Sequence, residues 1–75
     1  MKCEMAIIDH TGDTKLIWDP DNNAEVEAAR EMFNSLRKKG HVAYKVDRKG
    51  DKGEIITEFD KDAEKIILAP PVRGG

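Results

Sequence analysis

Cysteine, histidine and aromatic residues are scarce in this sequence. Its 75 residues include one cysteine, two histidines and four aromatic side chains. Because the single Cys3 cannot form a disulfide within the chain, no internal covalent cross-link stabilises the fold. No apolar run is long enough for a secretory signal or a membrane span. We therefore expect a cytoplasmic protein whose fold depends on a small hydrophobic core.

The scarcity of reactive side chains also argues against an enzyme. A chain of this length builds one small domain, whose thin core leaves no room for a deep pocket. Cys3, His10 and His41 are the main candidates for nucleophilic or metal chemistry, and no Cys-x-x-Cys or His-x-x-x-His spacing joins them. We predict no catalytic residue, no bound metal and no cofactor.

The first part of the chain predicts a β-hairpin. In residues 2–8 the odd-numbered side chains are apolar, as in a strand with one buried face. Residues 9–13 are rich in turn formers, and residues 14–19 alternate again. Gly12 supplies the positive φ that tight hairpin loops require.

A single helix is predicted next, over about residues 22–39. Asn22 and Glu25 have the spacing of a capping box, with Asn in the capping role. Gly40 is well placed to end the helix. Apolar side chains three or four positions apart form one stripe, which consists of Val26, Ala29, Phe33 and Leu36.

Three more strands are predicted after the helix. Their expected ranges are 41–47, 54–59 and 65–69, with one helical turn over 60–64. In the first of these strands, the alternation predicts three residues that face the core and three that face outward. The inward set is Val42, Tyr44 and Val46, and the outward set is His41, Ala43 and Lys45.

The end of the chain, Pro70-Pro71-Val72-Arg73-Gly74-Gly75, is predicted to leave the sheet. Neither proline offers a backbone N–H donor, so this segment cannot continue in a sheet interior. We therefore predict a domain over residues 1–69 and a projecting tail over residues 70–75.

The order of elements, strand-strand-helix-strand-strand-strand, predicts the α+β class. A mixed sheet packed on one helix in a single domain covers both the helix stripe and one sheet face. The helix serves as a crossover, so we expect the first and last strands to be central, parallel neighbours.

This layout resembles the β-grasp fold of ubiquitin and its small relatives. The resemblance rests on the hairpin, the single helix, the later strands and the ending Arg73-Gly74-Gly75, and it covers the whole chain in element order but not residue by residue. The runs Thr11-Gly12-Asp13-Thr14 and Trp18-Asp19-Pro20, with the ending Pro70-Pro71-Val72-Arg73-Gly74-Gly75, also resemble small uncharacterised bacterial or phage reading frames, to which we attach no function.

The resemblance implies a role for the tail. Ubiquitin-like modifiers and small sulfur carriers are activated by adenylating enzymes at a terminal Gly-Gly, where the absence of Cβ lets the backbone thread a narrow channel. By this resemblance Gly75 supplies the reacting carboxylate and Gly74 the clearance. Arg73 then provides a charged contact for the activating enzyme. Pro70-Pro71 departs from the family pattern, because the family runs an extended strand there.

Charge is unevenly distributed along the chain. The net charge is -2. Residues 37–52 carry a local charge of +5, whereas residues 1–36 carry -5 and residues 53–75 carry -2. The basic set is Arg37, Lys38, Lys39, Lys45, Arg48, Lys49 and Lys52. An acidic protein surface fits this set better than nucleic acid does, because the whole domain is acidic and only Tyr44 is available for base stacking.

Two hypotheses of function remain open. In the first, a ubiquitin-like modifier or sulfur carrier is activated at Gly75 by a partner enzyme. In the second, a non-covalent interaction module of a phage or bacterium docks on a protein partner through its exposed sheet and its basic segment. Nucleic-acid binding through residues 37–52 ranks below both. All three describe a small protein that acts through its surface.

Overall fold

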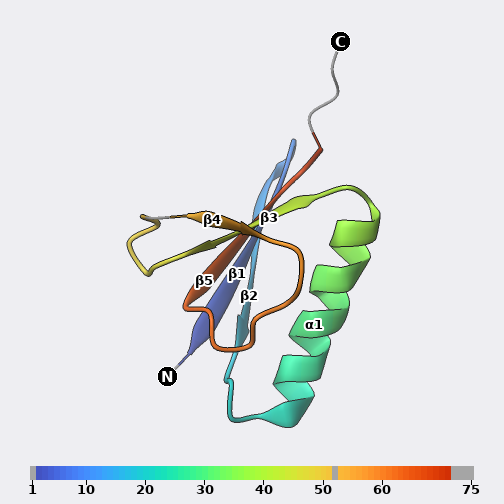
Figure 1. Ribbon diagram of the computed structural model, residues 1–75. Coiled ribbons are helices and arrows are strands. Elements are labelled where there is room, and N and C mark those ends of the chain that lie inside the picture. The colour runs from blue at the N-terminus through green and yellow to red at the C-terminus, as the bar shows by residue number, and fades with distance from the viewer. Residues whose placement is uncertain (1, 52, 72–75) are drawn as a thin grey trace.

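A computed structural model describes residues 2–51 and 53–71 of the chain. The described residues form five strands and one helix, joined by short connections (Figure 1). The elements in chain order are β1 (Cys3–Asp9), β2 (Gly12–Trp18), α1 (Asn23–Lys38), β3 (Val42–Val46), β4 (Glu54–Ile56) and β5 (Lys65–Ala69). The predicted α+β class and single domain are confirmed.

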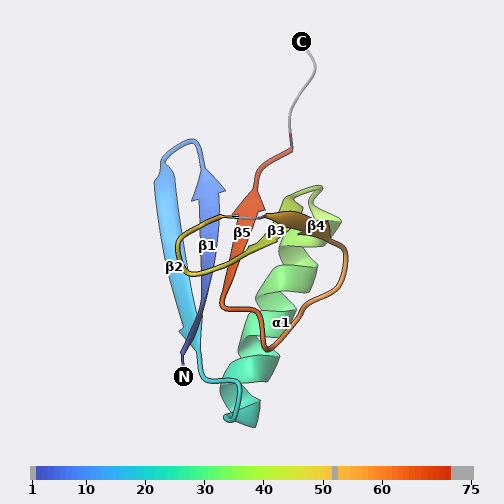
Figure 2. The same cartoon turned by 60° about the vertical axis from the view of Figure 1, so that its left-hand side comes forward.

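The five strands make one mixed sheet in the order β2-β1-β5-β3-β4. Strands β1 and β5 are parallel and central, as predicted, and the other pairs are antiparallel. Figure 2 shows this arrangement, with the helix behind the sheet. The order and the single crossover helix are compatible with a β-grasp-like fold.

The hairpin turn is tighter than the sequence predicts. Asp9 pairs directly with Gly12, which leaves a loop of only His10 and Thr11. Gly12 has a φ of 135°, a conformation that side chains with a Cβ rarely adopt. The Asp9 carboxylate accepts bonds from the Thr11 N–H (2.8 Å) and hydroxyl (2.6 Å). These bonds hold the pKa of Asp9 below its usual value.

The helix begins and ends where its capping residues predict. The Asn22 side chain accepts a bond from the Glu25 N–H at 3.2 Å, and the Glu25 carboxylate accepts one from the Asp19 N–H at 2.9 Å. Glu25 therefore ties the helix to the preceding turn rather than to the N-cap backbone. Gly40, with a φ of 96°, follows the C-cap Lys39. The predicted stripe of four apolar residues is buried.

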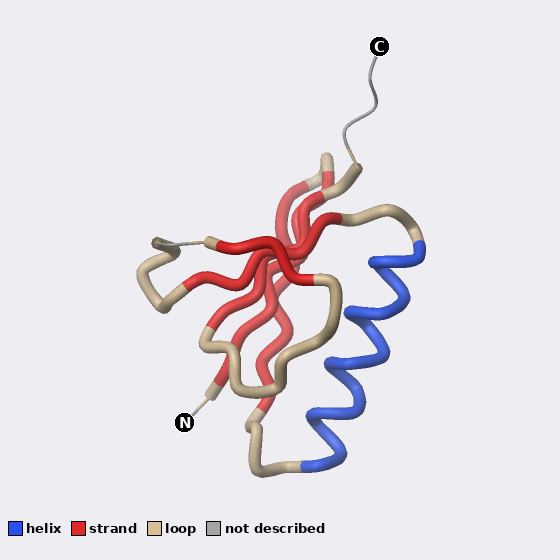
Figure 3. Tube along the Cα trace, in the orientation of Figure 1, coloured by secondary structure: helices blue, strands red, loops and turns tan. Residues whose placement is uncertain are grey.

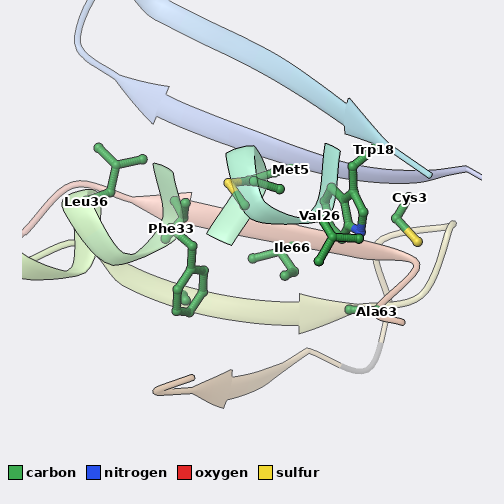
Figure 4. Close-up of a cluster of buried hydrophobic side chains, with 11 residues drawn as sticks. Cys3, Met5, Trp18, Val26, Phe33, Leu36, Ala63 and Ile66 are labelled. Atoms are coloured by element: carbon green, nitrogen blue, oxygen red, sulfur yellow. The ribbon is translucent and has the colours of Figure 1, made fainter. Parts of the chain in front are cut away.

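The hydrophobic core lies between the helix and one face of the sheet (Figure 4). Its largest fully buried side chains are Trp18, Phe33 and Met5. The indole of Trp18 also donates a hydrogen bond to the Lys61 carbonyl at 2.9 Å. This bond attaches the segment between β4 and β5 to the core.

That segment differs from its prediction. Strand β4 ends at Ile56 rather than at residue 59, and residues 60–64 form a turn instead of a helical turn. Phe59 leaves the sheet because its ring packs on Trp18, with ring centroids 5.2 Å apart, and on Phe33 at 5.8 Å. An aromatic contact with the core thus ends the strand early.

Candidate interaction surface

The two faces of the sheet differ in what covers them. The helix covers one face, and Figure 3 shows the opposite face without a helix among the described residues. Alternate side chains of each strand point to opposite faces, so the register decides which residues lie on the uncovered face. We call this the open face.

Apolar side chains from four strands meet on the open face. Ala6 pairs with Ile67, Ile67 with Tyr44, and Tyr44 with Ile55, so these four form a row across β1, β5, β3 and β4. At strand spacing, this row extends about 14 Å. Two more apolar residues of the same face, Ile8 and Val42, lie next to the row. The open-face patch consists of Ala6, Ile8, Val42, Tyr44, Ile55 and Ile67.

Members of the open-face patch are accessible to a partner. Ile55 is 66% exposed and Ile8 is 40% exposed, Val42, Tyr44 and Ile67 are half-buried, and only Ala6 of the patch is buried. Single exposed apolar residues are ordinary on protein surfaces, but contiguous patches more often mark binding sites. The patch is bordered by the ion pair between Lys65 and Glu4, whose charged atoms are 3.5 Å apart.

The sequence prediction for β3 was wrong about Val42, Tyr44 and Ala43, whereas Val46, also predicted to be inward, is buried at 7% exposure but lies outside the core cluster. Ala43 is fully buried and belongs to the core cluster, whereas Val42 and Tyr44 face the other way. Lys45 lies on the helix side of the sheet, at its rim. The apolar stretch Ile66-Ile67-Leu68 is the signal that could have revealed the open-face patch, because an unbroken apolar strand has apolar residues on both faces.

The predicted basic residues fall into two groups at opposite ends of β3. Arg37, Lys38 and Lys39 lie at the carboxyl end of α1, which precedes β3. The Arg37 guanidinium donates a hydrogen bond to the His41 carbonyl at 2.8 Å and thereby helps to close the turn. The positive charges of this group stabilise the carboxyl end of α1, where the helix dipole favours them.

The second basic group lies at the other end of β3, and two of its members are paired with acids. The Lys45 ammonium is 3.1 Å from the Asp60 carboxylate and 3.5 Å from that of Glu54. Arg48 lies 3.2 Å from the Glu64 carboxylate. Lys49 is in the loop after β3, which is closed by hydrogen bonds from its own N–H and that of Asp51 to the Asp47 carboxylate. Lys52 lies outside the described residues.

Lys45 sits in an open groove of about 280 Å³ whose other charged lining residues are acidic. The hydrogen bond to Asp60, followed by the charges of Asp60 and Glu54, raises the pKa of Lys45. Partial burial raises the pKa of Asp60, but bonds from the Asp62 N–H and from Lys45 outweigh it and leave that pKa below its usual value. Contacts with Asp60 and Glu54 of the same chain therefore explain where the Lys45 side chain lies, without a partner protein.

The candidates for reactive chemistry are separated or buried. Cys3 is fully buried in the core, and burial, followed by the charge of Asp62, raises the pKa of its thiol. His10 is exposed in the hairpin loop, and His41 lies before β3 at the opposite end of the helix from Cys3. Within residues 2–51 and 53–71, no three His, Cys, Asp or Glu residues are grouped to hold a metal ion.

The chain leaves the sheet at the position that the sequence predicts. Strand β5 ends at Ala69, and Pro70 and Pro71 are exposed. The Pro71 ring lies beside Gly40, so that a Cβ on Gly40 would be 3.6 Å from it. The proposed activation residues Arg73, Gly74 and Gly75 lie outside the described residues.

No protein-family model matches this chain, and no curated protein or solved structure gives a significant match. In the part of the chain that the structure describes, no helix is long and apolar enough to cross a membrane.

Proposed function

We propose that this protein acts without catalysis, by binding another protein through the open face of its sheet. The observation that supports the proposal is the open-face patch, an apolar row crossing four strands on the side that α1 does not cover. Removing an apolar surface of this kind from water against a partner lowers the free energy and so favours binding. The charged border at Glu4 and Lys65 adds polar groups at the rim, as in known interfaces.

The size of the open face favours transient binding. Stable interfaces bury about 800 Å² on each partner, whereas the apolar row is about 14 Å long and a few side chains wide. A partner that meets only this face should therefore bind weakly, with an apolar or aromatic side chain seated near Ile67 and Tyr44.

Site-specific photo-crosslinking tests the proposal. A photoreactive residue replaces Ile55, and a matched chain carries it instead at Glu31, an exposed position on the helix. In a host lysate the first chain should form protein adducts that the second does not form. Ile67→Lys should remove these adducts while the circular dichroism spectrum is retained. Identical adducts from both positions, or adducts that persist in the folded Ile67→Lys chain, would refute binding through the open face.

A ubiquitin-like modifier or sulfur carrier is the second candidate function. It is supported by the exposed exit of the chain after β5, at Pro70 and Pro71, and by the Arg73-Gly74-Gly75 sequence. In this form of the proposal an adenylating enzyme is the partner, and the Gly75 carboxylate attacks the α-phosphate of ATP with release of pyrophosphate. Incubation with ATP and a host lysate should then change the mass of the carboxyl terminus. Equal behaviour of a chain without Gly74 and Gly75 would exclude this candidate.

A further inference from the structure

Strand β2 forms an open edge of the sheet. It pairs with β1 along its whole length, and in residues 2–51 and 53–71 no strand pairs with its other side. Its register contains no bulge, its sequence contains no proline, and residues 12–15 are exposed. Natural edge strands are often blocked by a bulge, a proline or charged side chains. Strand β2 has neither a bulge nor a proline, and its charged residues are Asp13 and Lys15, so a strand that offers complementary charges can pair with it. The opposite edge strand, β4, has only three residues.

The hairpin geometry shows which backbone groups of β2 point outward. The pair that closes a two-residue loop must be a hydrogen-bonded pair, and such pairs alternate with non-bonded pairs along the ladder. Asp9 and Gly12 close the loop, so Gly12, Thr14 and Leu16 direct their backbone groups toward β1. Asp13, Lys15 and Ile17 therefore direct theirs outward.

A second copy of the same edge fits these groups in one register. In an antiparallel pair around a two-fold axis, opposite residues must lie on the same face, which restricts the axis to a residue position. With the axis at Lys15, the two Lys15 side chains would be opposite each other, and with the axis at Asp13 the two Asp13 side chains would be. With the axis at Leu16, Lys15 would face Ile17.

The axis at Thr14 instead places Asp13 opposite Lys15 of the second copy, twice by symmetry. In both of these facing pairs, the backbone groups of Asp13 and Lys15 point toward the other copy. Each pair therefore forms two backbone N–H···O hydrogen bonds. Thr14 lies opposite its own copy. Opposite charges and Thr–Thr pairs at facing positions both stabilise antiparallel strands.

The surroundings of the edge leave room for this pairing. Figure 2 shows β2 as the outermost strand, with the helix crossing toward β3 and away from the hairpin. Figure 1 shows the hairpin extending past the end of α1. Residues 12–15 are exposed on both faces of the strand, so the helices of two copies need not occupy the same space.

We propose that two copies of this chain associate through antiparallel pairing of their β2 edges, with Asp13 of each copy opposite Lys15 of the other. The paired segment is short, so the dimer is weak and forms at high protein concentration. The pairing leaves the open-face patch free and places both patches on the same side of one continuous sheet. It does not depend on the function proposed above.

Charge reversal tests both the edge and its register. Asp13→Lys and Lys15→Asp each place like charges opposite each other twice, so each should weaken self-association by about tenfold or more. An equal mixture of the two single variants restores opposite charges at every facing position and should associate at least as well as the original chain. The double variant Asp13→Lys/Lys15→Asp should also regain self-association. Matched controls are Lys39→Asp and Glu58→Lys, which make the same charge changes at exposed positions outside β2.

Backbone amide exchange and diffusion, measured by NMR from micromolar to millimolar concentration, report the outcome. In the original chain the amides of Asp13 and Lys15 should exchange more slowly as concentration rises, whereas that of Thr14, already bonded to β1, should not change. The proposal is overturned if diffusion and these two amides are independent of concentration. It is also overturned if both single variants self-associate like the original chain, or if their mixture does not recover.

Discussion

Trp18→Phe should destabilise the protein by about 2–3 kcal/mol. Trp18 is fully buried, and its indole N–H donates to the Lys61 carbonyl at 2.9 Å. Its ring lies 5.2 Å from that of Phe59, centroid to centroid. The residue therefore joins the end of β2 to the segment between β4 and β5, which contains little regular structure of its own.

The magnitude follows from two losses. Phenylalanine cannot donate the hydrogen bond, and leaving this partly buried carbonyl without its indole donor costs about 1–2 kcal/mol, less than the upper end of the range for a fully buried group. The Cys3 thiol, with its sulfur 3.7 Å from the same oxygen, is a weak replacement donor. The lost indole area adds about 1 kcal/mol. For a chain of this size the total corresponds to a fall in melting temperature of about 10–20 °C.

Urea unfolding followed by circular dichroism measures this change without relying on tryptophan fluorescence. The neighbouring substitution Ile17→Ala is the control, because Ile17 is on the same strand but 56% exposed and should cost less than about 1 kcal/mol. Hydrogen exchange at Ala63, whose N–H bonds to the Asp60 carbonyl at 3.2 Å, should accelerate in Trp18→Phe. A loss of stability no larger than that of Ile17→Ala would refute the assigned role of the indole.

Three other predictions follow from burial and charge. Asp60 has a folded-state pKa below its unfolded value, so its stabilising effect is present above the unfolded pKa of about 4 and is lost as pH falls. The urea midpoint of the original chain should therefore fall between about pH 5 and 3, and in Asp60→Asn it should fall less. The Cys3 thiol should react with a thiol reagent about a thousandfold more slowly in the folded protein than in urea, because reaction requires opening of the core. Ala43→Leu should cost about 1–3 kcal/mol by overpacking, whereas Tyr44→Leu should cost less than about 1.5 kcal/mol, both measured by urea unfolding; the reverse order would restore the original β3 assignment.

The helix and the central strands were predictable because several independent signals agree at those positions. The Asn22 cap, the apolar stripe and Gly40 all indicate the same helix, and the structure places it at Asn23–Lys38. The parallel pairing of β1 and β5 followed from the position of the crossover helix in the chain.

The orientation of β3 could not be predicted from alternation alone. Val42, Tyr44 and Val46 are larger than Ala43, so the pattern favoured them as core residues. In the structure Phe33 and Leu36 of the helix fill the adjacent core, and the small Ala43 fits there. Only the packing of another element decides between two apolar faces of one strand.

The composition of the interaction surface was also hidden in the sequence. The charge count of residues 37–52 suggested one basic surface, but the count does not show which charges have partners. Lys45 and Arg48 bond to Asp60 and Glu64, residues that lie far away in the chain and adjacent in the fold. A run of like charge in sequence therefore became two separate groups in space.

Folding accounts for the burial of one apolar face of this sheet but not for the apolar side chains on the other face. The helix is 16 residues long and covers a single face, where Phe33, Met5 and Ile66 are fully buried. Ile55 is 66% exposed, so it gains little from folding, and a polar residue at this strand position would cost little stability. The row that Ile55 forms with Tyr44 and Ile67 across three strands therefore contributes little to the stability of the fold. It is an apolar surface that a partner can bury.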